Sequence, residues 1–519
     1  MDLTTIHQRR WWTLAVMNVC LLLTVVDHTI LNVALPTLAR DLGASGSQLQ
    51  WIVDSYVLVF AGLLLPAGAL GDRFGRRGAL NAGLAVFTLG SIAGMLSGTA
   101  TQLIIARSVM GVGAALIMPA TLSIITNVFT DGVERGRAIA LWATVGGSAM
   151  AIGPVMGGWL LEHFHWSSMF IINLPMAAIA FVATIVVVPT SKDPETPPLD
   201  FAGALLSIVG LTALVWAIIN GGEHGWTTTS TIAGFAVAAV SLAGFAAWEF
   251  HTPHPMLDIT FFQNRRFSAA SLTVMFGYFA LFGTMFLLTQ LLQFVLGYSA
   301  LGAGVRILPF ALTMAAFAPV SARLVERFGT KVVVVGGMVL VATGLMWGAL
   351  VDDHSTYGAY LPTMLIMGAG VALTWAPATE AIMGSLPPSK AGVGSAVNDT
   401  VREVGGALGV AVLGSLVAGR FASHIRPATS ALPDGVRETA SDSLGGALGV
   451  AQHLDQPAAG QLTQAARTAF MNGFSLALTV GAVVALAGAV LAARWLPARA
   501  TDAEVRVDDV EDAEFALAG

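Results

Sequence analysis

Three charged side chains fall inside long apolar segments of the sequence, where charge is costly. Asp27 lies in an apolar run that begins at Trp11, Asp54 lies in the next run, and Arg107 lies near the start of a later one. Ionisable residues inside a membrane usually face a cavity and mark an ion or substrate path. A partly desolvated carboxylate beside a cation is balanced between its charged and neutral forms. These residue types therefore predict proton coupling by Asp27, Asp54 and Arg107.

Each of the three also has a structural interpretation. Asp27 could hydrogen-bond neighbouring backbone, and Arg107 could form a purely structural ion pair. Asp54 lies close to the predicted end of its apolar run, so the structural alternative carries more weight for Asp54 than for the other two.

A second charged group lies further along the chain. Asp399 and Glu403 are four residues apart, so they share a helix face, and Arg402 can offset one of them. With Glu380 they would lie near one mouth of a transport path, where acids attract cations. The alternative is a set of salt bridges that closes this mouth.

Polar and aromatic side chains suggest the wall of a cavity. Gln290 and Gln293 are the best polar candidates, because both lie in one apolar run. Aromatic rings stabilise cations, and methionine adapts to ligands of varied shape. Lipid contact or packing is the alternative for each of these residues, which are Trp142, Phe276, Tyr278, Phe282, Met285, Phe286 and Trp375.

Composition places these residues in a membrane protein. The chain has 519 residues, of which 55% are hydrophobic and only 11% charged, and its mean hydropathy is +0.75. Soluble domains carry about a quarter charged residues. The single cysteine, Cys20, excludes a disulfide framework. We expect no catalytic or metal site and no nucleic-acid partner, because no nucleophile–base pair, metal-ligand spacing or basic patch is present.

Fourteen apolar segments are long enough to cross a bilayer, which needs about 20 residues per helix. The first lacks a convincing cleavage site, so we expect it to be retained as a span. Two segments, 301–322 and 396–419, are the weakest because they contain charges. The fourteen are residues 12–35, 49–70, 78–98, 102–126, 137–160, 168–190, 201–220, 231–250, 268–294, 301–322, 332–351, 359–384, 396–419 and 471–495.

The distribution of Lys and Arg predicts the orientation of the spans. If the amino terminus is cytoplasmic, the inner loops hold most of the Lys and Arg, whereas the short outer loops hold only Arg40. An even number of spans then places both termini in the cytoplasm, and we expect a multi-pass protein of the inner membrane. Asp27, Asp54 and Arg107 fall in the outer half of the bilayer by depth.

Three motifs recur in the same order at nearly constant spacing, which indicates an internal duplication. Glycine patterns that serve only helix packing are the alternative. The pairs are GDRFGRR at 71–77 with VERFGTK at 325–331, GVGAALIMPAT at 111–121 with GAGVALTWAPAT at 368–379, and VGG at 145–147 with VGG at 404–406.

The repeat predicts four parts. We expect an amino-terminal six-helix bundle at 1–192, two linking spans at 193–255, a carboxy-terminal six-helix bundle at 256–496 with an outer loop at about 420–470, and an acidic tail at 497–519. The substrate site is expected between the two bundles. The segment SDSLGGALGVAQHL in the outer loop suggests a short interfacial helix.

The loop GALGDRFGRRGAL, residues 68–80, concentrates charge between the second and third spans. Its glycines permit tight turning, and its aspartate can cap a helix. Its arginines can pair with acids on neighbouring loops, such as Asp131 and Glu134. Pairing in only one conformation would make a latch; positive-inside charge alone is the alternative. The latch residues are Gly71, Asp72, Arg73, Gly75, Arg76 and Arg77.

This loop resembles the signature of the major facilitator superfamily, and the resemblance extends over nearly the whole chain. Within that superfamily, the chain is similar to the fourteen-helix drug:proton antiporters. The segments that carry this likeness are DHTILNVALP at 27–36, WIVDSYVL at 51–58, LIIARSVMGVGAA at 103–115, GGSAMAIGPVMGG at 146–158, HWSSMFIINLP at 165–175, PMLDITFFQNRRF at 255–267 and GSAVNDTVREVGGALGVAVLG at 394–414.

The resemblance implies roles for particular residues. Arg107 is expected next to Asp27, and a kinked, closely packed fifth helix is expected around the antiporter motif, Gly153, Pro154, Gly157 and Gly158. Two departures stand out. His28 follows Asp27 where the branch more often has a small polar residue. Glu326 replaces the aspartate in the second copy of the loop signature, which also lacks the arginine pair, so a weaker second latch is expected.

The implied function is export of lipophilic, cationic drugs or toxic organic compounds in exchange for protons, and hence antibiotic resistance. Protons and cargo would bind Asp27 in turn. The proton gradient would be the energy source, no cofactor is expected, and the protein is expected to be a monomer. One rival is a dedicated exporter of an endogenous metabolite, antibiotic or lipid; another is a non-transporting receptor or scaffold. The phosphate-binding motif GxxxxGK[ST] is absent, which argues against an ATP-driven pump.

Overall fold

The computed structural model describes residues 3–190, 200–253, 255, 257, 259–386 and 391–498. These residues form no strand, and 14 helical segments among them are long and apolar enough to cross a membrane. The predicted number of spans and the all-α class are therefore confirmed. The two weakest segments are both spans, at Ala300–Phe328 and Val397–Thr429. The tail from residue 499 lies outside the described residues.

The first six spans form one bundle. In it α3 and α2 both pack on α4, and α1 packs on α5. A short helix, α6, precedes α7, and the two together make the sixth span. The helices are α1 (Leu3–Asp41), α2 (Gly46–Phe74), α3 (Arg76–Met95), α4 (Ala100–Val128), α5 (Gly132–His163), α6 (Ser168–Ile171) and α7 (Asn173–Val187).

The last six spans form a second bundle with the same pairing of helices. Here α12 and α11 both pack on α13, and α10 packs on α14. Its elements are η1 (Ile259–Gln263), α10 (Arg265–Gln290), the π-helical turn η2 (Leu291–Val295), α11 (Ala300–Phe328), α12 (Thr330–Ala349), α13 (Tyr357–Met383), α14 (Ala391–Thr429) and α17 (Ala458–Trp495).

Close backbone contacts are repeated between the bundles. A Cβ atom at Gly111 on α4 would lie 2.6 Å from the Tyr56 carbonyl oxygen on α2, and one at Gly368 on α13 would lie 2.8 Å from the Phe310 carbonyl oxygen on α11. Only glycine permits helices to approach this closely. The repeated motifs 111–121 and 368–379 therefore occupy equivalent positions in the packing.

The loop signature is repeated in the same way. Gly75 ends α2 with a φ of 113°, and Gly329 ends α11 with a φ of 83°. This left-handed region strongly favours glycine. Both residues allow the chain to leave one helix and enter the next at once.

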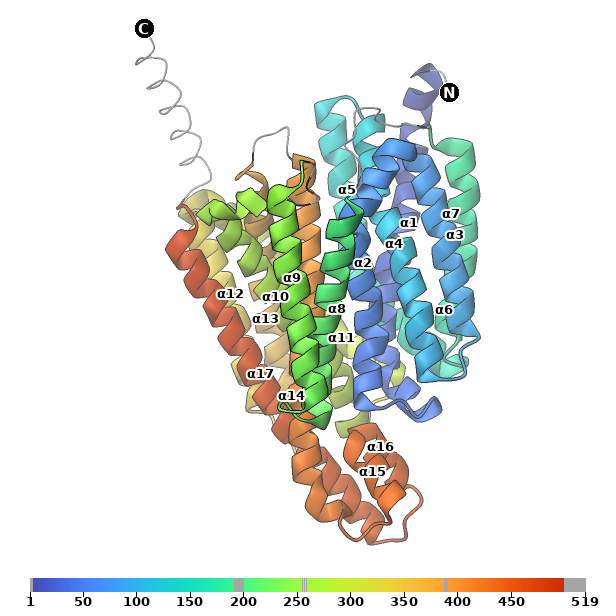
Figure 1. The fold of residues 1–519 in the computed structure, drawn as a ribbon, viewed down its shortest axis with the longest axis vertical. Coiled ribbons are helices and arrows are strands. Elements are labelled where there is room, and N and C mark those ends of the chain that lie inside the picture. The colour runs from blue at the N-terminus through green and yellow to red at the C-terminus, as the bar shows by residue number, and fades with distance from the viewer. Residues whose placement is uncertain are drawn as a thin grey trace.

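Two further spans, α8 (Phe201–His224) and α9 (Thr229–His251), lie between the bundles in the sequence. Helix α8 packs against α2 of the first bundle and α14 of the second, and Ser415 Oγ on α14 donates to the Ile218 carbonyl oxygen at 3.1 Å. Helix α9 packs mainly on α8 (Figure 1). The expected bridging of the bundles is thus made by α8. The exact boundaries at 192 and 255 remain predictions, since residues 191–199 lie outside the described part.

The molecule has two ends. We call the end where α1 begins and α17 ends the terminal face, and the opposite end, which carries α15 (Asp434–Asp442) and α16 (Leu444–Ala451), the distal face (Figure 1). The outer loop expected at 420–470 is shorter, because α14 continues to Thr429 and α17 begins at Ala458. The short helix expected within SDSLGGALGVAQHL is found as α16, and α15 precedes it. Its interfacial position stays a prediction.

Hydrogen bonds join the bundles near the distal face. Gln293 Nε2 donates to the Val33 carbonyl oxygen at 2.7 Å, and the Leu301 N–H donates to Glu162 Oε1 at 3.3 Å. Gln50 Nε2 donates to the carbonyl oxygens of Val410 and Ala411 at 3.3 and 3.5 Å. Each bond joins one bundle to the other. The distal ends of the bundles are therefore held together in this conformation.

Glycines make the same contact tight. A Cβ atom at Gly158 on α5 would lie 2.5 Å from Leu301 Cα on α11, and Gly304 on α11 lies directly against Pro154. Gly153 and Gly157 turn towards Thr29 and Ile30 of α1. The segment thus packs α5 against α1 and against α11 of the other bundle.

We predict that Gly158→Val forces the distal ends apart, because the larger side chain overlaps the α11 backbone. Spin labels on Leu96→Cys and Leu350→Cys, exposed positions after α3 and α12, would report this as a longer mean distance. Gly147→Val is the matched control, because a Cβ atom there meets nothing within 4 Å. An unchanged distance distribution in Gly158→Val would contradict the proposed tight contact.

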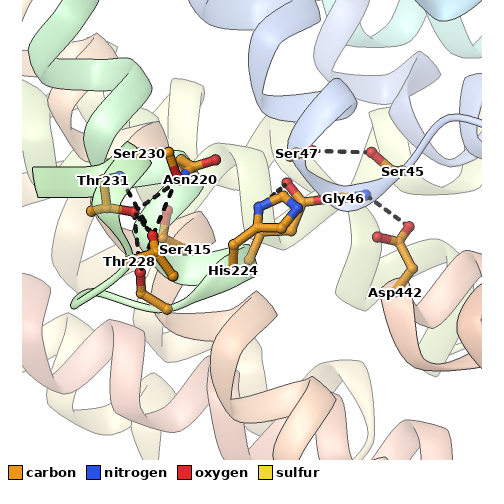
Figure 2. Close-up of polar contacts among 12 residues, drawn as sticks. Ser45, Gly46, Ser47, Asn220, His224, Thr228, Ser230, Thr231, Ser415 and Asp442 are labelled. Atoms are coloured by element: carbon orange, nitrogen blue, oxygen red, sulfur yellow. Dashed lines mark hydrogen bonds and ion pairs between the residues drawn. The ribbon is translucent and has the colours of Figure 1, made fainter. Parts of the chain in front are cut away.

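Helix α15 is fastened to the first bundle by one carboxylate. The N–H of Gly46, the first residue of α2, donates to Asp442 Oδ2 at 3.3 Å (Figure 2). Burial raises the pKa of Asp442, the charge of Glu223 on α8 and that of Glu438 raise it further, and the bond from Gly46 lowers it. The net direction is upward.

The docking of α15 is expected to tighten as the pH falls. A pKa raised in the docked state means that docking is most favourable below the ordinary pKa of a free carboxyl and weakens as pH rises through the raised value. Amide hydrogen exchange in residues 434–451, corrected for intrinsic rates, should therefore be slower at low pH. Asp442→Asn should remove this dependence; slower exchange at higher pH in the wild type would contradict the assignment.

Candidate functional site

The centre of the first bundle holds a buried ion pair. Arg107 Nη1 on α4 donates to Asp27 Oδ2 on α1 at 2.5 Å, and each side chain is only 1% exposed. Arg107 Nε also donates to the Ile52 carbonyl oxygen, and its guanidinium lies 4.2 Å from the ring centroid of Tyr56. The adjacency expected of Asp27 and Arg107 is found.

Small residues on α4 explain how Arg107 reaches this position. Because Gly111 lets α4 approach the Tyr56 backbone, the guanidinium one turn earlier lies against the tyrosine ring. A charge-assisted hydrogen bond in a low-dielectric site is strong, but it must offset the desolvation of both groups. Close packing and the hydrogen bonds of Asp27 and Arg107 offset this desolvation cost.

Asn173 completes the pair and was missed by the sequence analysis. Its Nδ2 donates to Asp27 Oδ1 at 2.7 Å and to Ser91 Oγ at 3.3 Å. Asn173 is the first residue of α7 and is 1% exposed. An amide within the apolar stretch FIINLP was the available signal. Both oxygens of Asp27 therefore accept a hydrogen bond, an arrangement that suits the charged carboxylate.

Asp54 is buried differently. It lies on α2 with 0% exposure, and neither of its carboxylate oxygens has a hydrogen-bond partner among the described residues. A buried charge without a partner is costly. No contact among the described residues uses the Asp54 carboxylate, so the structure offers no support for a structural role of this side chain.

An aromatic row joins the ion pair to the second bundle. The row consists of Phe60, Tyr56, His28, Phe282, Tyr278 and Trp375, whose consecutive ring centroids lie 6.0, 5.7, 5.1, 5.7 and 4.5 Å apart. His28 and Phe282 form the link between α1 and α10. Such distances are typical of interacting aromatic pairs. Tyr278, Phe282 and Trp375 were among the predicted cavity residues.

The second charged group lies at the far end of this row. Arg402 Nη1 donates to Asp399 Oδ1 at 3.4 Å, and its guanidinium lies 5.5 Å from the Tyr278 ring centroid. Glu403 is close enough to Tyr56 and Tyr278 to interact with both electrostatically. An arginine–aspartate pair beside a tyrosine therefore stands at each end of the row.

Glu380 is exposed and lies on α13 apart from these contacts. Thr379, its neighbour, accepts a hydrogen bond from Arg402 Nη2 at 3.0 Å.

The two glutamines do not line the aromatic row. Gln293 bridges the bundles at the distal contact, and Gln290 donates within its own helix to the Phe286 carbonyl oxygen at 3.4 Å. Both belong to the end of the molecule where the bundles are in contact.

The charged loop between α2 and α3 has different partners from those expected. Arg76 Nη1 donates to the Ser123 carbonyl oxygen and Arg77 Nη1 to the Val188 carbonyl oxygen, whereas Arg73 lies near the Phe74 ring. The expectation that Glu134 serves these arginines is wrong, because Arg10 of α1 holds it through two hydrogen bonds of 2.9 and 3.0 Å.

Two members of the predicted latch add nothing further. Gly71 accepts the N–H of Gly75 at its carbonyl oxygen, at 2.9 Å. The side chain of Asp72 lies outside the described residues.

A buried ion pair inside the first of two repeated bundles of membrane-spanning helices is typical of a membrane transporter. The family model described as Major Facilitator Superfamily matches residues 17–410, and the chain belongs to this superfamily. It is a multi-pass membrane protein and a transporter, not an enzyme. Members of the superfamily that act in efflux use ion gradients in place of a cofactor.

Its relatives include several efflux proteins. The chain is 36% identical over 483 residues to the multidrug efflux pump LfrA of Mycolicibacterium smegmatis, covering 93% of this chain and 95% of the relative. It is 35% identical to the methyl viologen resistance protein SmvA of Salmonella typhimurium, covering 91% and 95%. It is 33% identical to the tetracenomycin C resistance and export protein of Streptomyces glaucescens, covering 93% and 91%.

Solved structures share the fold. A bacterial homologue of the human lysosomal transporter Spinster, in an inward-facing and occupied conformation, matches with a TM-score of 0.65 at 16% identity, over 94% of this chain and 97% of that one. A transporter of the POT family in complex with 5-aminolevulinic acid matches with a TM-score of 0.64 at 15% identity, over 93% and 96%.

Removal of the Asn173 amide should destabilise the protein through Asp27. Asn173→Leu leaves one oxygen of a buried carboxylate without a donor, at a cost of about 1.5–3 kcal/mol. We therefore expect a lower thermal unfolding midpoint in detergent. Ser91→Ala, which removes only the second contact of the amide, should cost less.

The loss of thermal stability in Asn173→Leu should depend on the charge of Asp27. In an Asp27→Asn background, Asn173→Leu should lower the unfolding midpoint much less, because the two substitutions share one interaction. An equal loss in both backgrounds would show that Asn173 acts through packing alone.

Proposed function

We propose that this transporter exports lipophilic, cationic drugs or toxic organic compounds across the cytoplasmic membrane in exchange for protons. The terminal face would then lie in the cytoplasm, as the loop charges predict. The observation that carries the proposal is the buried Asp27 carboxylate, held by Arg107 and Asn173 inside a transporter whose relatives include efflux pumps.

Protonation of Asp27 would act as a switch. In the present arrangement both oxygens accept hydrogen bonds from donors that have no acceptor lone pair to offer in return. A proton on either oxygen removes one acceptor and the charge that balances Arg107. The contact between α1 and α4 then loses its electrostatic basis, and Arg107 becomes a cation without a partner. Such a local change can bias a two-state element.

Asp54 supports a second step in the same bundle. Its carboxylate has no polar partner among the described residues, so a bound proton removes a costly buried charge. We propose that Asp54 holds a proton in this conformation while Asp27 does not. The two acids would then exchange roles as the bundles move, and Arg107 would keep Asp27 charged until that movement.

Cargo would enter from the terminal face. The distal ends of the bundles are joined by the hydrogen bonds of Gln293, Gln50 and Glu162, and this would close the opposite route. Acidic residues attract cations towards the path, with Glu380 exposed and Asp399 and Glu403 beside the aromatic row. Gln290 and Gln293 would contact cargo only when the distal contact opens.

The charged loop residues Gly71, Asp72, Arg73, Gly75, Arg76 and Arg77 would change partners during this movement. In the present state, Arg76 and Arg77 each donate to a backbone carbonyl within the first bundle. These bonds tie the α2–α3 turn to α4 and to the end of α7, so the first bundle moves as a unit. We propose that bonds across to the second bundle form when the terminal face closes.

We expect proteoliposomes with an imposed pH gradient to move methyl viologen, a dication, and not its neutral parent 4,4′-bipyridine. Asp27→Asn should abolish gradient-driven transport, because the amide cannot exchange a proton, and Asp54→Asn should uncouple transport from the gradient. Asp41→Asn is the matched control, since Asp41 is exposed at the distal end of the same helix. Methyl viologen flux and internal pH are both measured.

Two results would reject parts of the proposal. Gradient-driven transport that survives in Asp27→Asn would exclude this residue from coupling. Transport of one neutral metabolite in preference to cations would favour the dedicated exporter of an endogenous compound, the alternative that the likeness to an antibiotic export protein of Streptomyces supports.

A further inference from the structure

His28 occupies a singular place in the aromatic row. It contacts Tyr56 of its own bundle at 5.7 Å and Phe282 of the other bundle at 5.1 Å between ring centroids. Among the ring pairs within the described residues, His28–Phe282 is the one whose members come from different bundles. Any movement of one bundle against the other must therefore change this contact.

The rings of His28 and Phe282 do not stack, so a flat ligand ring between them could make better contacts than they make with each other. The two rings are tilted by 44°, whereas Tyr278 and Trp375 stack at 12° and 4.5 Å. Parallel stacking is among the preferred arrangements of aromatic pairs, and His28 and Phe282 do not reach it. A flat ring between them would gain two stacked faces, and it would need the rings to separate to about 7 Å, two contact layers of about 3.5 Å each.

The imidazole also brings an unused polar atom. His28 Nε2 is buried and has no hydrogen-bond partner among the described residues. A buried polar atom in this condition is costly until it finds a partner. A phenylalanine at this position would supply the same ring faces without that cost, so His28→Phe separates the role of the ring from that of the nitrogen.

Charge near the row favours a cation. Asp27 and Asp399 are each paired with an arginine. Glu403 makes no hydrogen bond or ion pair with the described residues, and its charged neighbours are Arg402 and Asp399, which both act on it electrostatically. It lies close enough to Tyr56 and Tyr278, on either side of the His28–Phe282 pair, to interact with both. Aromatic faces attract cations, and a carboxylate beside them adds negative charge to the same place.

We infer that His28 is a specificity-determining residue that selects flat aromatic cations, whose ring inserts between His28 and Phe282 while Glu403 balances the charge. This inference rests on the proposed export of cations and adds the shape of the cargo. Gly406 of α14 supports the site, because it lies directly behind Phe282: a Cβ atom there would be 3.4 Å from that ring.

The test compares two dications of equal charge, methyl viologen, which is flat and aromatic, and hexamethonium, which is aliphatic. Binding of each to purified protein is measured by calorimetry. His28→Leu should weaken methyl viologen about three- to tenfold, the range expected for one lost aromatic contact, and leave hexamethonium unchanged. His28→Phe keeps a ring and should retain most of the affinity for methyl viologen.

The outcomes separate the inference from the proposed function. An equal loss of both dications in His28→Leu, or equal losses of methyl viologen in His28→Leu and His28→Phe, would overturn the role of His28 and leave cation export standing. Wild-type protein that binds neither dication would overturn both. His163→Leu, at an exposed histidine at the distal end of α5, is the matched control, and thermal unfolding verifies that each variant is folded.

Discussion

One buried interaction organises the first bundle: the ion pair of Asp27 and Arg107 with the Asn173 amide. It joins α1, α4 and α7 at a depth where water cannot replace a lost partner. Desolvation makes such a pair expensive to form and more expensive to break on one side only. Loss of the carboxylate charge would therefore weaken the contacts among three helices at once.

The glycine contacts translate this local event into movement of whole bundles. Gly158 and Gly304 bring α5 and α11 into backbone contact, and Gly414 on α14 lies against Gln50 of α2. Packed backbones of this kind slide or separate as rigid surfaces and do not deform gradually. The distal contact is therefore either made or broken, which is the property that alternating access requires.

The sequence contained the architecture, and the family resemblance placed Arg107 beside Asp27, but the other contacts of this pair were not foreseen. Run length and loop charge predicted fourteen spans, because a bilayer fixes how long an apolar helix must be. The charged residues beside Tyr56 and Tyr278, which are Asp27, Arg107, Asp399 and Arg402, were found because a charge interrupts an apolar run. Asn173 was missed because an uncharged amide barely interrupts an apolar run, and the partner of Glu134 was misassigned because Arg10 is distant in sequence and its approach depends on the helix packing.

The two arginine–aspartate pairs beside the aromatic row are similar in composition but differ in burial. Arg107 and Arg402 each lie beside an aspartate and a tyrosine, yet the first pair is buried with a third partner, whereas the Arg402 and Asp399 side chains are 26% and 41% exposed. Solvent access makes the second pair weaker and easier to exchange. A cation that arrives from the terminal face would therefore displace the Arg402 contact before it could disturb Arg107. From this difference in burial we propose an order of events, in which cargo is recognised in the second bundle before Asp27 is released in the first.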